Sequence, residues 1–178
     1  MKTKLIVLVI LINSLSYSQN VKIIKNEIQQ SINKQKTNLI KTSDAIWEFA
    51  ETSLVEFESS KVLMDYARKN GFDVKPGVAG IKTAFTASYG QGRPIIGILG
   101  EFDANAGISQ KRQPKKESRV PGAAGHGCGH NLFGTASLGA AVAIKEQIEK
   151  GNIKGTVIFY GTPAEETIFA KVWMVREG

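Results

Sequence analysis

The sequence contains few of the residues that form covalent or metal cross-links: one cysteine and two histidines among 178 residues. A single cysteine cannot form a disulfide within the chain, which excludes a small scaffold held together by disulfides. Long apolar runs are also lacking. The run LIVLVILI, residues 5–12, is shorter than the roughly 20 residues that a membrane-spanning helix needs, so we expect no stable membrane span.

Nucleotide and nucleic-acid binding also lack their usual signals. No Gly-x-Gly-x-x-Gly or Walker-type loop follows a predicted strand. The formal net charge is +7, and residues 110–119 carry five bases and one acid, with no aromatic residue among them. The sequence therefore predicts a near-neutral body with one basic loop, and no nucleic-acid surface.

The first 18 residues have the three-part pattern of a secretory signal peptide. Lys2 and Lys4 precede the apolar run, and the small residues Ser16 and Ser18 precede a cut near Gln19. A retained membrane anchor is the alternative, but no cysteine near the cut could carry a lipid. We expect export to the periplasm or the medium, with residues 19–178 as the mature domain.

The remaining chain is long enough for one domain with a hydrophobic core. Apolar residues first recur at helical spacing, then form short strand-like runs, and after that helix-like and strand-like segments alternate. This pattern indicates an α/β domain with a largely parallel sheet. Ser59 and Ser60 are plausible N-caps of the second helix. The expected helices cover about 21–50, 59–70, 130–150 and 168–175, and the expected strands 72–75, 83–89, 94–102 and 155–161, the last two of them buried.

The segment GHGCGH, residues 125–130, places the only cysteine and both histidines within six positions. In an extended backbone, side chains two apart point the same way, so His126, Cys128 and His130 would share one face. Imidazole and thiolate are natural ligands of zinc and similar divalent ions. A metal would also occupy a thiol that is otherwise exposed to an oxidising compartment.

Carboxylates follow two of the predicted strands. Asp103 follows the strand that ends in GEF, and Glu165 and Glu166 follow GTVIFYG. Ligands of open α/β sheets gather at the carboxyl ends of strands, so these residues should meet Cys128 and His130 there. One glutamate of the pair can bind metal while the other acts as a base. Taken singly, the glutamate pair could be solvated surface, Asp103 a turn residue, and Cys128 the nucleophile of a cysteine hydrolase.

Three motifs in order, GILGEFDANAGISQ (97–110), GHGCGHNLFGTASLGAA (125–141) and YGTPAEE (160–166), resemble the metallo-amidohydrolase and aminoacylase family of metallopeptidases, in its p-aminobenzoyl-glutamate hydrolase-like branch. The resemblance covers about residues 40–178. It implies a three-layer catalytic domain with a central sheet flanked by helices, two divalent ions (zinc or manganese), and hydrolysis of amide bonds in N-acyl or N-aroyl amino acids. A homo-oligomer is possible for the full-length family-like protein.

The resemblance also implies a role for each matching residue. Cys128, His130 and Glu166 would be metal ligands, with Cys128 bridging the two ions. Glu165 would be the general base that takes a proton from the attacking water. Asp103 would orient a ligand, as carboxylates behind metal ligands do. The role of His126 stays open.

The sequence also departs from the family pattern. Asn105-Ala106 replaces the usual Leu-Pro, and Thr167-Ile168-Phe169-Ala170 stands where small residues are typical. Family members are longer and carry a lid domain and further histidine ligands, whereas no histidine follows His130 here. We therefore expect an N-terminal portion of a catalytic domain that is inactive alone. The alternatives are a non-catalytic metal-binding remnant and a truncated pseudogene product. The basic loop would draw in an anionic substrate.

Overall fold

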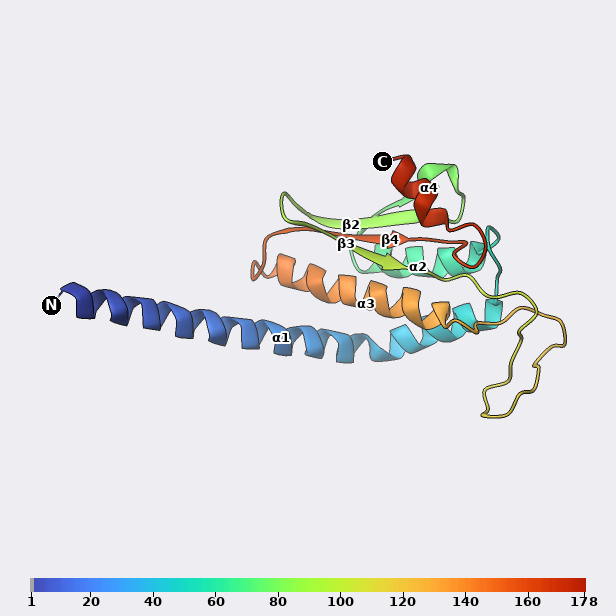
Figure 1. Ribbon diagram of the computed structural model, residues 1–178, viewed down its shortest axis with the longest axis horizontal. Coiled ribbons are helices and arrows are strands. Elements are labelled where there is room, and N and C mark those ends of the chain that lie inside the picture. The colour runs from blue at the N-terminus through green and yellow to red at the C-terminus, as the bar shows by residue number, and fades with distance from the viewer. Residues whose placement is uncertain (1) are drawn as a thin grey trace.

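The computed structural model describes the backbone of residues 2–178 and the side chains of residues 21–178 (Figure 1). The predicted signal peptide, residues 1–18, lies outside the described side chains and stays a prediction. No helix with described side chains is long and apolar enough to cross a membrane. The elements follow in the order α1 (Lys2–Phe49), α2 (Phe57–Lys69), β1 (Asp73–Pro76), the 3-10 helix η1 (Val78–Gly80), β2 (Phe85–Gln91), β3 (Ile95–Gly100), α3 (His130–Glu149), β4 (Gly155–Gly161) and α4 (Ala170–Arg176).

The four strands form one mixed sheet in the order β1-β2-β4-β3. β3 and β4 are parallel, with Gly100 opposite Gly161 at their carboxyl ends. β2 runs antiparallel to both β1 and β4. The predicted α/β class is confirmed. Among the described strands the parallel arrangement is limited to the β3–β4 pair. These two strands are consecutive in the chain and are joined by a crossover through α3, as a parallel pair requires.

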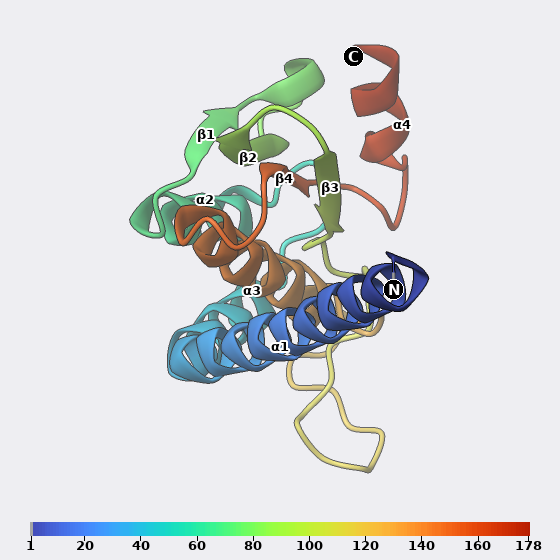
Figure 2. The ribbon, with the colours of Figure 1, turned by 90° about the vertical axis from the view of Figure 1, so that its left-hand side faces the viewer.

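Helices cover both faces of the sheet, as the predicted three-layer arrangement requires. α2 and α3 lie against one face and α1 packs on their outer side, whereas the short helix α4 lies on the opposite face (Figures 1 and 2). The core lies between the sheet and α2 and α3. Its fully buried side chains include Leu63, Phe85, Leu138, Val157 and Phe159, and each contributes about 1.5–3 kcal/mol by leaving water.

The prediction that β3 is covered on both faces is wrong for the described chain. β3 pairs only with β4 and forms an edge of the sheet. Ile95, Ile96 and Leu99 are each about half exposed, at 54%, 50% and 47%. In β4, buried residues alternate with half-buried ones, because only the face toward α3 is fully covered. An apolar run alone does not distinguish a central strand from an edge strand.

The predicted start of the second helix is also corrected. α2 begins at Phe57, so Ser59 and Ser60 lie inside its first turn and are not its N-caps. The carboxylate of Glu51 accepts hydrogen bonds from the N–H groups of Glu58 and Ser59, at 3.0 and 2.8 Å. Free N–H groups of the first helical turn need such acceptors. The cap comes from a residue before the helix that periodicity could not identify.

Two glycines let α3 approach the end of β3 closely. A Cβ atom on Gly134 would lie 2.4 Å from the carbonyl oxygen of Glu101, and one on Gly100 would lie 3.1 Å from the Cα atom of Gly134. The first distance is shorter than real Cβ contacts, and the second would require the two backbones to move apart by a few tenths of an ångström. The close approach places the first turn of α3, which begins with His130, beside the residues that follow β3.

Candidate metal centre

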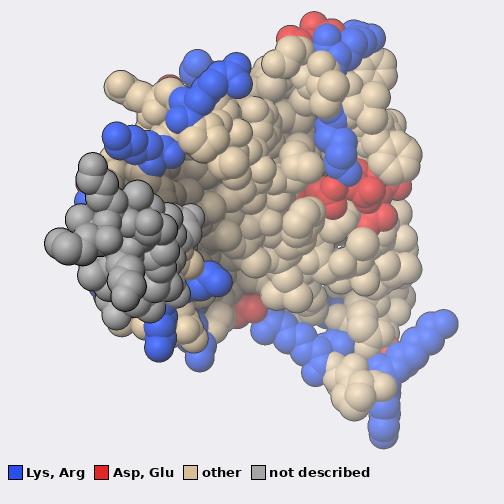
Figure 3. Space-filling model, turned by 60° about the vertical axis from the view of Figure 1, so that its left-hand side comes forward, with Lys and Arg blue, Asp and Glu red and all other residues tan. Residues whose placement is uncertain are grey.

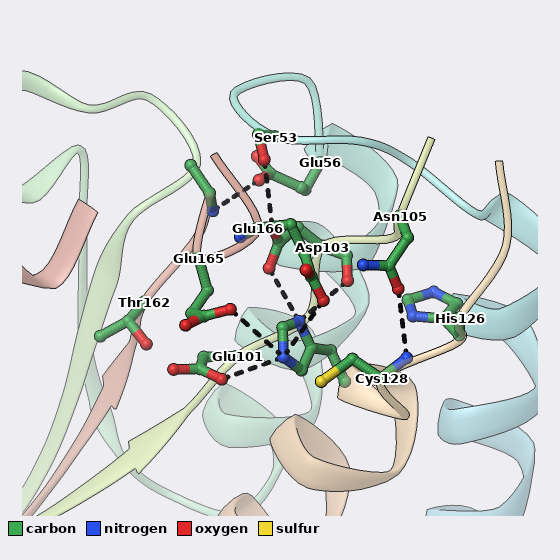
Figure 4. A network of polar contacts seen from close by, with 12 residues as sticks. Ser53, Glu56, Glu101, Asp103, Asn105, His126, Cys128, Thr162, Glu165 and Glu166 are labelled. Carbon is green, nitrogen blue, oxygen red and sulfur yellow. Dashed lines mark hydrogen bonds and ion pairs between the residues drawn. The ribbon is translucent and has the colours of Figure 1, made fainter. Parts of the chain in front are cut away.

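The predicted site residues meet at one edge of the sheet because β3 and β4 are parallel. Both strands end there, and the chain continues from β3 into Glu101 and Asp103 and from β4 toward Glu165 and Glu166. His130 enters the same region as the first residue of α3. Figure 4 shows the side chains of Glu101, Cys128, Glu165 and Glu166 pointing into the same space. Oxygen atoms of the three glutamates lie 3.1–3.8 Å from His130 Nε2.

His130 is held in one orientation by Asp103. Its Nδ1 lies 3.0 Å from Asp103 Oδ1 and 3.1 Å from the Asp103 carbonyl oxygen. Because both oxygens accept hydrogen bonds, Nδ1 carries the proton and donates it. Nε2 therefore points into the site, and in the neutral ring its lone pair is free to bind metal.

Asp103 is itself buried and fully bonded, with 1% of its surface exposed. Its second oxygen, Oδ2, accepts hydrogen bonds from Ser53 Oγ at 3.1 Å and from the Glu166 N–H at 2.9 Å. Burial works to raise the pKa of Asp103, but the hydrogen bonds from His130 and Glu166 and the charge of His130 outweigh it, so the pKa is lowered. One carboxylate thus ties the start of α3 to the turn after β4.

Cys128, His130 and Glu166 form the first group of potential metal ligands. One ligand atom of each lies within 4.8 Å of the others. Among the described residues, Glu166 Oε1 is buried without a hydrogen-bond partner, and it lies 3.8 Å from His130 Nε2. A buried carboxylate oxygen is costly to leave unpaired. A thiol, an imidazole nitrogen and this oxygen therefore fit a divalent ion.

Glu101 was not among the residues predicted from the sequence. Its Oε2 lies 3.1 Å from His130 Nε2, and it forms a second group of potential ligands with His130 and Glu165. Lys171, in the first turn of α4, contacts Glu101 Oε1 at 2.5 Å and lies 3.8 Å from Glu165 Oε1. The sequence signal was its place at the carboxyl end of the predicted strand 94–102, two residues before Asp103.

In the metal-free protein, Cys128 and His130 both hold their protons more firmly than usual. Burial raises the pKa of the Cys128 thiol, and the negative charges of Glu166 and Glu165 add to this. Burial works to lower the pKa of His130, but Asp103 and the charge of Glu101 outweigh it, so that pKa is raised. A metal ion that binds here must displace these protons.

Asn105, one of the departures from the family pattern, supports the cysteine segment. Its side-chain Oδ1 accepts the Cys128 N–H at 3.1 Å. Its backbone pairs with Gly125 through two hydrogen bonds of 3.0 Å. An asparagine here fixes the exposed loop that carries Cys128.

His126 does not share a face with Cys128 and His130, contrary to the prediction from alternation. The backbone is not extended through the segment: Gly129 has φ of 81°, and His130 already belongs to α3. His126 Nε2 instead lies 3.0 Å from the carbonyl oxygen of Ile46, at the end of α1. Burial lowers the pKa of His126. We therefore assign it a contact with α1.

Glu56 is a further buried carboxylate near the site that the sequence did not single out. It is fully buried and accepts hydrogen bonds from Thr83 Oγ1 at 2.9 Å and from the Ala164 N–H at 2.8 Å. Ala164 directly precedes Glu165 and has a positive φ of 57°. Burial raises the pKa of Glu56. Glu56 thus anchors the turn that presents the glutamate pair.

Comparison with known proteins places these motifs in an enzyme family. A subunit of the p-aminobenzoyl-glutamate hydrolase of Escherichia coli (strain K12) is 45% identical over 152 residues, which are 85% of this chain and 32% of that protein. The IAA-amino acid hydrolase ILR1-like 4 of Arabidopsis thaliana is 34% identical over 122 residues, 68% of this chain and 26% of that protein. No protein-family model matches the chain.

Solved structures agree with the fold. The Bacillus subtilis YXEP protein, described as a dinuclear metal-binding peptidase of the M20 family, superposes with a TM-score of 0.62 at 30% identity, over 73% of this chain and 35% of that one. An aminobenzoyl-glutamate utilization protein from Klebsiella pneumoniae gives a TM-score of 0.58 at 14% identity, over 85% of this chain and 43% of that one, and shows the fold alone. The chain spans about a quarter to a third of the length of the curated relatives it matches.

Proposed function

This chain belongs to the metallo-amidohydrolase and aminoacylase family of metallopeptidases, and we propose on that premise that the protein hydrolyses amide bonds in N-acyl or N-aroyl amino acids with two divalent ions, zinc or manganese. The observation that carries the proposal is the convergence of Cys128, His130 and Glu166, whose ligand atoms lie within 4.8 Å of one another. These three residues would hold the metal. When bound, divalent ions lower the pKa of water and polarise a carbonyl group.

Glu165 is the proposed general base. Its Oε2 lies 3.8 Å from His130 Nε2, so it faces the same space as the ligand atoms, and its side chain is 26% exposed, so solvent can reach it. It takes a proton from the attacking water, whose oxygen joins the carbonyl carbon. The same proton is then passed to the amine as the carbon–nitrogen bond breaks. Asp103 keeps His130 oriented throughout and does not contact the substrate.

Metal binding by the 178-residue chain is the first test. We expect the purified chain to bind divalent metal and a Cys128→Ser variant to bind much less, because a thiolate is replaced by a weak hydroxyl ligand. Metal analysis of the two proteins after dialysis decides this. Equal metal contents would remove Cys128 from the site. We expect the isolated chain to bind metal without turnover.

Hydrolysis is tested in a chimera, in which residues of this chain replace the matching segment of the Escherichia coli p-aminobenzoyl-glutamate hydrolase. We expect the chimera to hydrolyse p-aminobenzoyl-glutamate, and Glu165→Gln to lower kcat by at least about 100-fold while metal content is unchanged. A chain that binds metal but gives an inactive, folded chimera would favour the alternative, a metal-binding remnant without catalysis.

We also propose that residues 1–18 direct export of the protein to the periplasm or the medium. The support is the basic start, the apolar run and the small residues before Gln19. Expression in a bacterial host, followed by mass spectrometry of the exported chain, should find an N-terminus near Gln19. Recovery of only uncut, cell-associated protein would contradict the proposal.

A further inference from the structure

Lys171 places a positive charge inside the ring of carboxylates at the site. Its Nζ lies 2.5 Å from Glu101 Oε1 and 3.8 Å from Glu165 Oε1. The side chain of Glu101 is 13% exposed and that of Lys171 30%, so water screens this contact only in part. Figure 4 shows Glu101 and Glu165 side by side. Two neighbouring carboxylates repel unless a proton or a cation lies between them, and the ammonium supplies that cation.

The two groups of potential ligands share His130. Its Nε2 lies 3.1 Å from Glu101 Oε2 and 3.8 Å from both Glu165 Oε2 and Glu166 Oε1, so it faces both groups. Its Nδ1 is committed to Asp103, so the ring offers a single lone pair. Once Nε2 binds an ion beside Cys128, Glu101 and Glu165 keep two carboxylates and no neutral ligand.

From this geometry we infer that the ammonium of Lys171 occupies the position between Glu101 and Glu165 and keeps a divalent ion out of it. Lys171 is then a positioning residue, since it acts through the carboxylates of Glu101 and Glu165 and not on the substrate. Its effect is to leave the carboxylate of Glu165 unligated and able to accept a proton. This inference rests on the proposed role of Glu165 as the base.

The experiment is a cobalt(II) titration of the 178-residue chain and its variants. Isothermal calorimetry counts the ions, and the thiolate-to-cobalt absorption band reports the ion at Cys128. We expect Lys171→Met to bind one cobalt ion more than the wild-type chain, because a unit positive charge within about 4 Å of that ion is removed. Where the wild-type chain binds this ion weakly, the variant should bind it at least about tenfold more tightly. Adding Glu165→Gln or Glu101→Gln to Lys171→Met should abolish the gain.

Two controls make the test specific. Lys171→Arg keeps the positive charge and should bind cobalt as the wild type does. Lys150→Met removes a lysine that pairs with Glu27 at 2.7 Å, away from the site, and should also leave binding unchanged. Circular dichroism checks that each variant is folded.

Three results would contradict the inference. The first is no additional ion in folded Lys171→Met, and the second is equal tightening of every binding step, which would indicate a general charge effect. The third is an additional ion that survives Glu101→Gln and Glu165→Gln. A wild-type chain that binds no cobalt at Cys128 would instead overturn the proposed metal centre, and the inference with it.

Discussion

Asp103 uses both carboxylate oxygens to hold the site together. Oδ1 accepts a hydrogen bond from His130 Nδ1, and Oδ2 accepts hydrogen bonds from Ser53 Oγ and from the Glu166 N–H. It therefore fixes one potential ligand directly and the backbone of another. Its influence on metal binding should exceed that of any neighbour that makes only one of these contacts.

Asp103→Asn should weaken metal binding by about 10- to 100-fold, the usual cost of losing a carboxylate behind a histidine ligand. The asparagine presents one oxygen and one NH₂ group, so it cannot accept from His130 and Glu166 together. Calorimetric titration with zinc or cobalt measures the affinity. The matched control is Ser53→Ala, which removes one hydrogen bond from Oδ2 and leaves His130 untouched. Similar losses in both variants would show that the orientation of His130 is not what matters.

The contact between Asp103 and His130 also predicts how the free energy of unfolding of the metal-free chain depends on pH. The pKa of Asp103 is lowered in the folded state, so its contribution is present above its unfolded pKa of about 3.9 and is lost as pH falls through the folded pKa. The pKa of His130 is raised, so its contribution is full below about pH 6.5 and is lost as pH rises through the folded pKa. This pair thus contributes most between these limits.

We measure urea unfolding from pH 3 to 9, with metal removed by a chelator. The free energy of unfolding should fall below about pH 3.9 and again above about pH 6.5. Asp103→Asn should make both decreases smaller, because one partner of the Asp103–His130 pair loses its charge. Decreases of unchanged size in the variant would assign the pH dependence to other groups.

At the scale of elements, the contact between α3 and β3 sets where His130 lies. α3 carries glycine at positions 134 and 139, but the two face different neighbours. A Cβ on Gly134 would meet the backbone oxygen of Glu101 at 2.4 Å, whereas one on Gly139 would meet the side chain of Leu39 at 2.9 Å. Leu39 can shift, but the end of β3 cannot shift without moving the site.

Gly134→Ala should accordingly destabilise the chain by about 1–3 kcal/mol and weaken metal binding, because α3 must move away from Glu101. Gly139→Ala provides the matched control in the same helix. There the better helix propensity of alanine, about 1 kcal/mol, offsets the crowding of Leu39, and metal affinity should be unchanged. Urea denaturation and metal titration measure both variants. If the two substitutions had equal effects on metal binding, the close contact at Gly134 would not position His130.

At the scale of the whole molecule, the basic loop is less basic than its composition indicates. Lys111 pairs with Glu117, Arg112 with Asp44 at 3.2 Å, and Arg119 with Glu48. Arg112 and Arg119 also lie over the ring of Trp47. Figure 3 shows Lys and Arg side chains gathered on this projecting loop.

Among the described residues, Lys115 and Lys116 are the loop bases without an ion pair, and both are exposed. The basic loop lies within the connection 101–129 between β3 and α3, and both ends of that connection meet the site. If the substrate is anionic, these two lysines are the ones that can attract it over a distance.

Reversing both charges, Lys115→Glu with Lys116→Glu, should lower kcat/KM of the chimera about three- to tenfold at low salt, with the difference shrinking as salt is added. The control reverses Lys22 and Lys25, which are exposed on α1. An unchanged kcat/KM and salt dependence would leave the loop without a steering role.

Local sequence determined the elements and the chemistry of the site. Periodicity and glycine punctuation located most helix and strand ends within a few residues, because apolar spacing and turn residues act locally. The start of α1 is the exception, since the helix begins at Lys2 and not at the expected residue 21. The types and order of Asp103, Cys128, His130, Glu165 and Glu166 indicated a metal-dependent hydrolase, because few other functions need these groups together. The resemblance of the motifs then predicted the family.

Only the tertiary structure decided which groups face each other. Glu101 and Lys171 joined the site, and His126 turned to the carbonyl of Ile46, because strand pairing and the close approach of α3 bring distant segments together. The edge position of β3 and the cap of α2 by Glu51 have the same origin. Contacts between residues far apart in the chain depend on packing, which no local pattern of residues encodes.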